Sequence, residues 1–153
     1  MTLTIRAATV ADASIVTAHR RAMFEDMRVG TLADLDAMDA QFGPWVARAL
    51  ANGAYLGWFV ATEQGTIIAS AGMSIEDFPA TPRDQTGRRA YVMNVYTDPK
   101  YRHQGLARRL MQTILDWCRE DGIHTVALQA SDEGRPLYES VGFKPTNELR
   151  LKL

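Results

Sequence analysis

The residues with the most distinctive chemistry form one short stretch near the middle of the chain. This stretch comprises Arg102, His103, Gln104, Gly105, Leu106, Ala107 and Arg108. It leads into the first turn of a predicted helix, where backbone N–H groups have no intrahelical acceptor and the helix dipole is positive. Gly105 has no side chain to obstruct an approaching anion, and Ala107 is nearly as small. The stretch therefore predicts a binding site for a phosphate group.

The segments on either side of this stretch are predicted to hold it in place. Residues 90–97 are rich in β-branched and aromatic side chains, which favours a buried strand, and Asp98 and Pro99 end that strand. Residues 107–121 repeat apolar side chains at helical spacing, and Gly122 follows as a stop signal. The chain's single cysteine, Cys118, lies on the apolar stripe of this helix and is interpreted as a small buried hydrophobe.

The two best-known phosphate loops do not fit this stretch. The chain contains neither a Gly-x-Gly-x-x-Gly motif after a strand nor a Gly-x-x-x-x-Gly-Lys-Ser/Thr motif. Arg102-x-x-Gly105-x-Ala107 instead has the form Arg/Gln-x-x-Gly-x-Gly/Ala, and a second segment reads Leu137-Tyr138-Glu139-Ser140-Val141-Gly142-Phe143. Together they resemble the GNAT superfamily of N-acetyltransferases, whose pyrophosphate loop binds acetyl-CoA. The alternatives are an ordinary strand-to-helix turn with surface arginines and a site for another phosphate-containing ligand.

The resemblance implies a role for several further residues. The pantetheine arm of acetyl-CoA would lie along Val95, Tyr96 and Thr97, and the pyrophosphate would accept hydrogen bonds from the amides of residues 103–108. Tyr138 matches the family tyrosine that protonates the departing thiolate, and a phenol with a pKa near 10 is protonated at neutral pH. Ser131 stands where many members have an asparagine that bonds the pantetheine, and its side chain has a shorter reach.

The sequence does not identify a general base. Many family members carry a glutamate early in the strand before the loop, where this chain has Tyr91. Glu76 or Asp77 is a candidate acting through a water molecule, and an acceptor amine of low pKa needs no base. Asn94 is a candidate for orienting water or substrate. His19, on the apolar face of a predicted helix, is interpreted as a packed residue in preference to a catalytic one.

The remaining segments predict an α/β (α+β) fold in a single domain of residues 1–153. Strands are expected at 3–6, 55–61, 66–75, 125–130 and 148–153, and helices at 10–29, 32–50 and 135–140, the second of these broken or bent near Gly43 and Pro44. The element order is β-α-α-β-β-β-α-β-α-β. It predicts a GNAT-like mixed, mostly antiparallel twisted sheet with helices on both faces, in which a right-handed crossover joins two parallel strands.

Composition and charge narrow the class of function. A chain of 153 residues with 46% hydrophobic and 23% charged residues predicts a globular protein. The net charge of -1 shows no excess of basic residues of the kind that binds nucleic acid or a membrane surface. No segment has the pattern of a signal peptide or membrane span, so a cytoplasmic location is expected.

The expected activity is direct transfer of an acetyl group from acetyl-CoA to a primary amine, without a metal. A small-molecule acceptor is the default, and protein N-termini and lysines remain open. The first two helices and the loop at 79–89 are expected to select the acceptor. Trp58, Phe59, Phe24 and Trp45 are candidates for an apolar pocket floor, although such aromatics are more often core residues. A non-catalytic acyl-CoA sensor on the same fold is the rival hypothesis, and an isologous homodimer is the default assembly.

Overall fold

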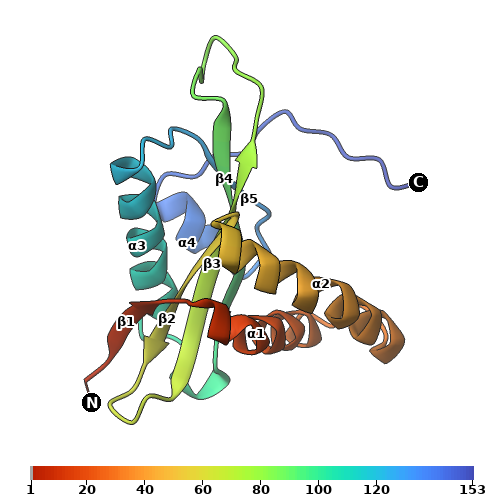
Figure 1. Cartoon of the computed structure of the whole chain (residues 1–153), viewed down its shortest axis with the longest axis vertical. Coiled ribbons are helices and arrows are strands. Elements are labelled where there is room, and N and C mark those ends of the chain that lie inside the picture. Colours follow the sequence, from red (N-terminus) through yellow and green to blue (C-terminus); the bar gives the residue numbers. More distant parts are fainter. Residues whose placement is uncertain (1) are drawn as a thin grey trace.

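A five-stranded sheet in the order β1-β2-β3-β4-β5 forms the centre of the computed structural model, which describes residues 2–153 (Figure 1). The strands are β1 (Thr4–Ala7), β2 (Tyr55–Ala61), β3 (Ile67–Asp77), β4 (Arg88–Thr97) and β5 (Val126–Leu128). The first four pair antiparallel with their neighbours, and β5 pairs parallel with β4. The prediction of a mixed, mostly antiparallel sheet is confirmed.

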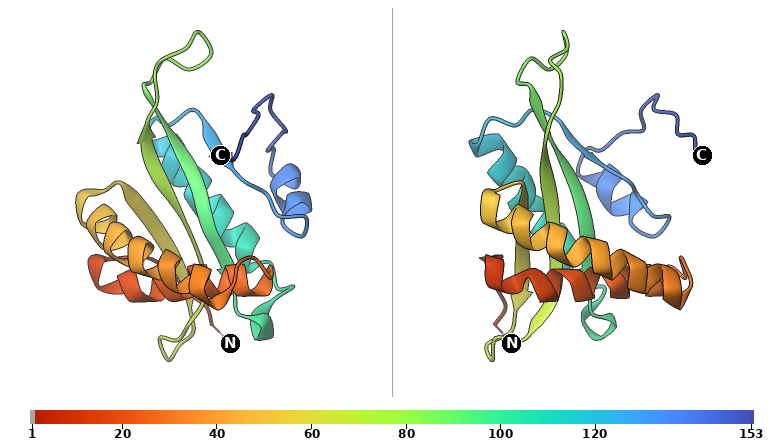
Figure 2. Two further views of the ribbon diagram at one scale, coloured as in Figure 1. Left: turned by 90° about the vertical axis from the view of Figure 1, so that its right-hand side faces the viewer. Right: turned by 45° about the vertical axis from the view of Figure 1, so that its right-hand side comes forward.

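Helices cover both faces of this sheet (Figure 2). The helices are α1 (Ala13–Asp26), α2 (Leu32–Asn52), α3 (Leu106–Glu120) and α4 (Arg135–Ser140), with short 3₁₀ turns at Val10–Asp12 and Pro99–Tyr101. One buried cluster joins α3 and α4 to the sheet, and a second joins α1 and α2 to residues of β2. The two clusters separate the molecule into one side that carries the phosphate-loop helix and another formed by the first two helices.

Strands β4 and β5 are neighbours over only a short length. Their pairing runs from Ala90 opposite Val126 to Val92 opposite Leu128. Beyond Val92, β4 continues to Thr97 with β3 on one side and no strand on the other among the described residues. Backbone groups on that free side of β4 are therefore available to a ligand, because a sheet edge leaves its N–H and C=O groups unpaired.

Two helix predictions need correction. The first helix ends at Asp26 instead of extending to residue 29, because Arg28 adopts a left-handed backbone with φ of 55°. The second helix runs unbroken from Leu32 to Asn52 through Gly43 and Pro44. Its buried face, which includes Phe42 and Val46 on either side of the proline, packs on the core and offsets the loss of one hydrogen bond.

The expected last strand is also wrong. Residues 144–153 have no regular secondary structure, and Leu149, Leu151 and Leu153 are 95%, 82% and 109% exposed. Alternating leucines give a segment one apolar face, but a strand forms only where a neighbouring strand accepts its backbone hydrogen bonds. None of the described strands pairs with this segment. No helix among residues 2–153 has the length and apolarity needed to cross a bilayer.

Candidate functional site

The loop before α3 presents an array of unpaired backbone donors. His103 and Gly105 have left-handed backbones, with φ of 62° and 77°, and α3 begins immediately afterwards at Leu106. The first amide to bond back into the helix is that of Arg109, which donates to the carbonyl of Gly105 at 3.1 Å. Residues 103–108 therefore direct free N–H groups outward at the positive end of a long helix, an arrangement that binds anions.

The basic side chains around this loop have different partners. Arg102 donates from Nε to the carbonyl oxygen of Thr97 at 2.9 Å, and its guanidinium forms an ion pair with Asp26 at the end of α1. Arg108 donates to Ser140 Oγ at 2.9 Å and so connects α3 to α4. Arg102 thus fixes the loop against α1, and the exposed amides carry more of the expected anion binding than its charge does.

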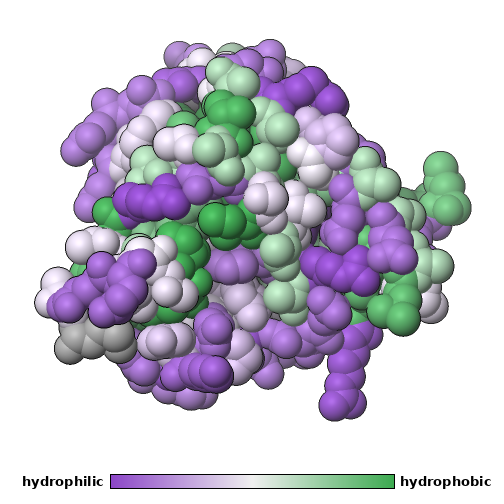
Figure 3. Space-filling view, turned by 60° about the horizontal axis from the view of Figure 1, so that its bottom comes forward, coloured by the Kyte–Doolittle hydropathy of each residue, from purple (hydrophilic) through white to green (hydrophobic). Residues whose placement is uncertain are grey.

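The end of the molecule that carries the loop is mixed in polarity. The space-filling view that brings the lower end of Figure 1 forward shows hydrophobic residues lying between hydrophilic ones (Figure 3). His103 and Gln104 are both exposed, whereas Leu106 is fully buried beneath them. The loop is consequently anchored by one apolar side chain while its polar groups face solvent.

The predicted pantetheine residues lead directly into this loop. Val95, Tyr96 and Thr97 are half-buried and lie on the part of β4 that has no β5 partner. The register with β3 shifts between Ser70 and Gly72, which places a bulge at Asn94, where φ is 59°. A bulge bends its strand and re-aims its backbone groups. The tertiary structure therefore brings the free edge of β4 and the donor loop together in one continuous stretch.

Tyr138 lies beneath the same region. It is 8% exposed and belongs to the core cluster that also contains Leu106. Its ring packs edge-on to Phe143 with centroids 6.1 Å apart, and lies so close to Gly134 that a Cβ there would be 2.8 Å from Cε2. Its hydroxyl makes no hydrogen bond to any described residue. Burial raises the pKa of Tyr138, so the phenol is protonated at neutral pH and can donate a proton.

Ser131 is used locally by the turn that precedes α4. Its Oγ accepts a hydrogen bond from the Gly134 N–H at 3.1 Å. The hydroxyl proton is still available to an acceptor, because a serine hydroxyl both donates and accepts. The predicted contact with pantetheine is therefore compatible with this geometry.

The two carboxylates considered as bases lie far along β3. Glu76 accepts from Arg89 Nε at 3.1 Å and from Ser74 Oγ at 3.3 Å, so both oxygens are engaged. The residue opposite the β4 bulge is Ala71, and the path from there to Glu76 is about 16 Å, since a strand rises roughly 3.3 Å per residue. Asp77 is one residue further away and exposed. Neither carboxylate is positioned to act at the bulge.

Two consecutive residues of α1 reach the bulge instead. His19 Nδ1 lies 2.6 Å from Ser70 Oγ, and its ring centroid is 4.9 Å from that of Tyr96. Burial lowers the pKa of His19, with a smaller opposing effect from Asp98, so the imidazole is neutral at pH 7. Arg20 NH1 donates to Asn94 Oδ1 at 2.7 Å. Helical periodicity indicated that His19 faces the core, but no local pattern indicated which strands it would meet.

Both polar atoms of the Asn94 side chain form hydrogen bonds within the protein. Besides accepting from Arg20, it donates from Nδ2 to the Tyr55 hydroxyl at 3.1 Å, and it is 3% exposed. Burial raises the pKa of Tyr55 to about 12. Asn94 therefore serves to hold the bulge, and this use of its side chain argues against the prediction that it orients water or substrate.

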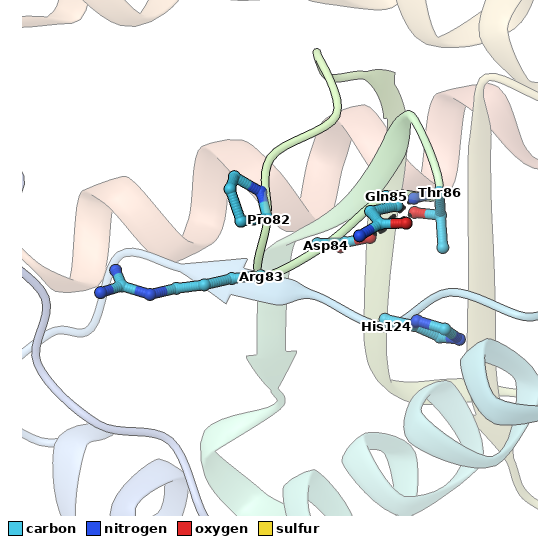
Figure 4. Close-up of a pocket in the computed structure, with 6 residues that line it drawn as sticks. All are labelled: Pro82, Arg83, Asp84, Gln85, Thr86 and His124. Carbon is cyan, nitrogen blue, oxygen red and sulfur yellow. Dashed lines mark hydrogen bonds between the residues drawn. The ribbon is translucent and has the colours of Figure 1, made fainter.

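The loop at 79–89 lies away from these residues. Strand β4 already begins at Arg88, so the loop is shorter than predicted, and it projects from the end of β3 and β4 opposite to the phosphate-loop end (Figure 1). Asp84 accepts from Thr86 Oγ1 at 2.7 Å and from Thr125 Oγ1 at 2.5 Å, which ties the loop to the start of β5. A depression on this loop is lined by residues 82–86 and His124 (Figure 4).

Other predicted contributors are structural. Trp58 and Phe59 are buried core residues on opposite faces of the sheet, and Trp45 packs against Phe42 and Tyr55. Within residues 2–153, no group of three or more His, Cys, Asp or Glu side chains is placed to hold a metal ion.

The sequence model of the Acetyltransferase (GNAT) family matches residues 20–143, which include the donor loop and α4, and the chain therefore belongs to that family. Among solved structures, a GCN5-related N-acetyltransferase from Ralstonia eutropha is 31% identical, with a TM-score of 0.92 and coverage of 99% of both chains. A structure described as a predicted acetyltransferase with acetyl-CoA, from Clostridium acetobutylicum, is 32% identical, with a TM-score of 0.90 and coverage of 99% of this chain and 96% of that one.

The curated relatives are matched over part of their length. A glucosamine 6-phosphate N-acetyltransferase from Trypanosoma brucei brucei is 33% identical over 92 residues, which are 58% of this chain and 59% of that protein. Human N-acetyltransferase 8 is 29% identical over 94 residues, 60% of this chain and 40% of that protein.

Proposed function

We propose that this protein is an N-acetyltransferase that moves the acetyl group of acetyl-CoA to a primary amine of a small molecule by direct attack. The observation that carries the proposal is the continuous array formed by the free edge of β4 and the unpaired amides of residues 103–108. Membership of the acetyltransferase family and the likeness to a structure with acetyl-CoA support it. The relative that acts on glucosamine 6-phosphate supports a small-molecule acceptor.

The residues of this chain fit two parts of acetyl-CoA, the pyrophosphate and the pantetheine arm. The N–H groups of residues 103–108 would bind the pyrophosphate, and Gly105 leaves space in front of them, since an added Cβ would meet no atom within 4 Å. The backbone of Val95, Tyr96 and Thr97 would hold the pantetheine arm as a strand edge holds an extended peptide. Acetyl-CoA supplies the activated acyl group when bound.

The proposed chemistry uses Tyr138 as the general acid. The acceptor nitrogen forms a bond to the carbonyl carbon, the carbon–sulfur bond breaks, and the phenol of Tyr138 donates its proton to the departing sulfur. The amine loses its proton to water, directly or through the neutral imidazole of His19. Holding the two reactants side by side supplies much of the acceleration, because it replaces a collision with a positioned encounter.

A non-catalytic acyl-CoA sensor is the second candidate. Tyr91 replaces the glutamate of many family members, and Glu76 is tied to Arg89 at a distance from the bulge. A sensor binds acetyl-CoA but releases no CoA with any amine, so turnover separates the two hypotheses.

The test is thermal unfolding with and without acetyl-CoA, followed by measurement of CoA release with a panel of amines. A ligand present at a hundred times its Kd stabilises the folded state by about 2.7 kcal/mol, which raises Tm by about 5–10 °C in a chain of this size. A shift with CoA release is the expected result. A shift without CoA release favours the sensor, and the absence of any shift contradicts the placement of the pyrophosphate.

A further inference from the structure

Arg20 is a half-buried cation at the place where α1, α2 and β4 meet. It extends from α1, and its guanidinium carbon lies 4.6 Å from the centroid of the Phe42 ring and 5.2 Å from that of Phe24. NH1 donates to Asn94 Oδ1, whereas Nε is completely shielded from solvent and has no hydrogen-bond partner among the described residues. Burial lowers the pKa of Arg20.

No carboxylate of residues 2–153 forms an ion pair with Arg20. Its neighbour Arg21 differs sharply, because it bonds both Asp36 and Asp39 at 2.8 Å. Arg102, which follows β4, is paired with Asp26 at the end of α1. A charge withdrawn from water without a counter-ion is costly, and the two aromatic rings compensate for only part of that cost. The pattern is that of a cation whose counter-ion comes from outside the chain.

The position of Arg20 indicates which molecule brings that counter-ion. Arg20 is bound to Asn94, the bulged residue of β4, which directly precedes the predicted pantetheine residues. Arg20 approaches this point from the side of α1 and α2, whereas Tyr138 and α3 belong to the cluster on the other side. A ligand that reaches the bulge from the side of the first two helices would therefore meet this guanidinium.

The contacts that hold Arg20 in place are built into the strands. Tyr55 crosses Gly72 to reach Asn94, and a Cβ at Gly72 would lie 2.0 Å from the Tyr55 hydroxyl oxygen. This glycine gives the tyrosine room to bond the amide of Asn94, which leaves the carbonyl oxygen of that amide to accept from Arg20. The guanidinium is thus fixed by a buried chain of hydrogen bonds and is preorganised to bind an anion.

We infer that the acceptor amine of this protein also carries an anionic group, a carboxylate or a phosphate, which pairs with Arg20 beside the β4 bulge. The inference rests on the proposed acetyl transfer and adds the chemical class of the acceptor. Arg20 acts as a specificity-determining residue: it binds the anion and leaves the acetyl transfer itself to the groups around β4 and Tyr138.

The experiment compares matched acceptors that differ only in the anionic group. Phenylalanine and phenethylamine test the carboxylate, and glucosamine 6-phosphate and glucosamine test the phosphate. The wild-type protein is expected to prefer the anionic member of at least one pair by tenfold or more in kcat/KM, and the pair that shows the preference identifies the anion. Wild-type protein that acetylates the members without the anionic group equally well overturns the inference and leaves the proposed function intact.

Variants then assign the preference to Arg20. R20Q is expected to reduce the preference to about unity, mainly by raising the KM of the anionic acceptor, so that kcat/KM falls at least about tenfold more for that acceptor than for the matched acceptor without the anionic group. R20K keeps a positive charge and is expected to keep part of the preference, which guards against loss of folding in R20Q. R21Q, on the next residue, is the control and is expected to keep the full preference.

A purely structural role for Arg20 predicts a different result. If Arg20 only supports Asn94, R20Q and R20K lower kcat/KM for both members of a pair by the same factor, and that result overturns the inference. Acetyl-CoA binding to the wild-type protein is measured first by its thermal shift. Failure at that step refutes the proposed function itself, so the two failures are distinguishable.

Discussion

The substitution Gly105→Ala tests the placement of acetyl-CoA most directly. Gly105 has a φ of 77°, and an added Cβ would meet no atom within 4 Å, so the methyl group causes no steric clash. Its effect on folding is limited to the strain of a left-handed backbone, about 1–2 kcal/mol for a non-glycine residue. For a domain of this size that corresponds to a fall in Tm of about 2–8 °C.

Gly122 provides a matched control at the other end of the same helix. It follows α3 with a φ of 74° and likewise has nothing within 4 Å of an added Cβ. Gly122→Ala should therefore cost the same stability as Gly105→Ala. Only Gly105, however, lies among the unpaired N–H groups of residues 103–108, where a methyl group occupies the space that the pyrophosphate needs.

The expected result is a difference in ligand affinity at equal stability. Gly105→Ala should weaken acetyl-CoA binding by at least about tenfold, or about 1.4 kcal/mol, whereas Gly122→Ala should leave the Kd within about twofold. Gly105→Glu adds a negative charge to the same space and should abolish binding. Isothermal titration with acetyl-CoA gives the affinities, and urea unfolding gives the stabilities. Equal affinities of the two alanine variants would refute the assignment of the loop.

Three further predictions concern the residues around β4. Tyr138→Phe should lower kcat by about 100-fold or more, with the KM for acetyl-CoA nearly unchanged, because it removes the proton donor. The Tm should change little, because the hydroxyl has no hydrogen-bond partner in the described chain. For His19, burial lowers the folded-state pKa below the unfolded value of about 6.5. The free energy of unfolding should therefore fall as the pH drops through and below that value. His19→Gln should remove this part of the fall, which urea unfolding measures between about pH 7.5 and about pH 5. Gly72→Ala should destabilise the protein by about 3 kcal/mol or more in urea, since its methyl group would overlap the buried Tyr55 hydroxyl.

Each of these predictions has a distinct contrary outcome. An unchanged kcat in Tyr138→Phe would remove the phenol from the mechanism. A pH dependence of stability that is the same in His19→Gln and in the wild-type protein would mean that other groups cause it. A Gly72→Ala protein of normal stability would show that Tyr55 can leave Asn94 at little cost.

The sequence predicted most of the elements and the loop before α3 because both depend on local properties. Proline and glycine at the ends of β4 and α3, together with the period of the apolar residues between them, indicated a strand, a turn and a helix. The position of Gly105 before the helix was sufficient to predict an anion site, since the unpaired N–H groups belong to that helix alone. The parallel pairing of β4 with β5 also followed, because a helix of this length connects parallel neighbours.

The tertiary structure decided which distant residues meet. Alternating leucines predicted a strand at 148–153, but a strand depends on a neighbour that the pattern cannot supply, and the structure leaves Leu149 and Leu151 exposed. Glu76 precedes β4 by only about a dozen residues in the sequence. Along β3, however, it lies about 16 Å from the residue opposite the bulge, because an extended strand rises roughly 3.3 Å per residue.

The contact between Arg20 and the bulge could not be predicted from the sequence for the same physical reason. Its partner Asn94 is 74 residues away in the chain, and contacts over that separation depend on how α1 docks on the sheet. Local sequence thus determined the loop of unpaired N–H groups before α3. Packing of α1 against β4 placed His19 and Arg20 beside the bulge, because the register of one element on another is fixed by the whole core and not by either segment alone.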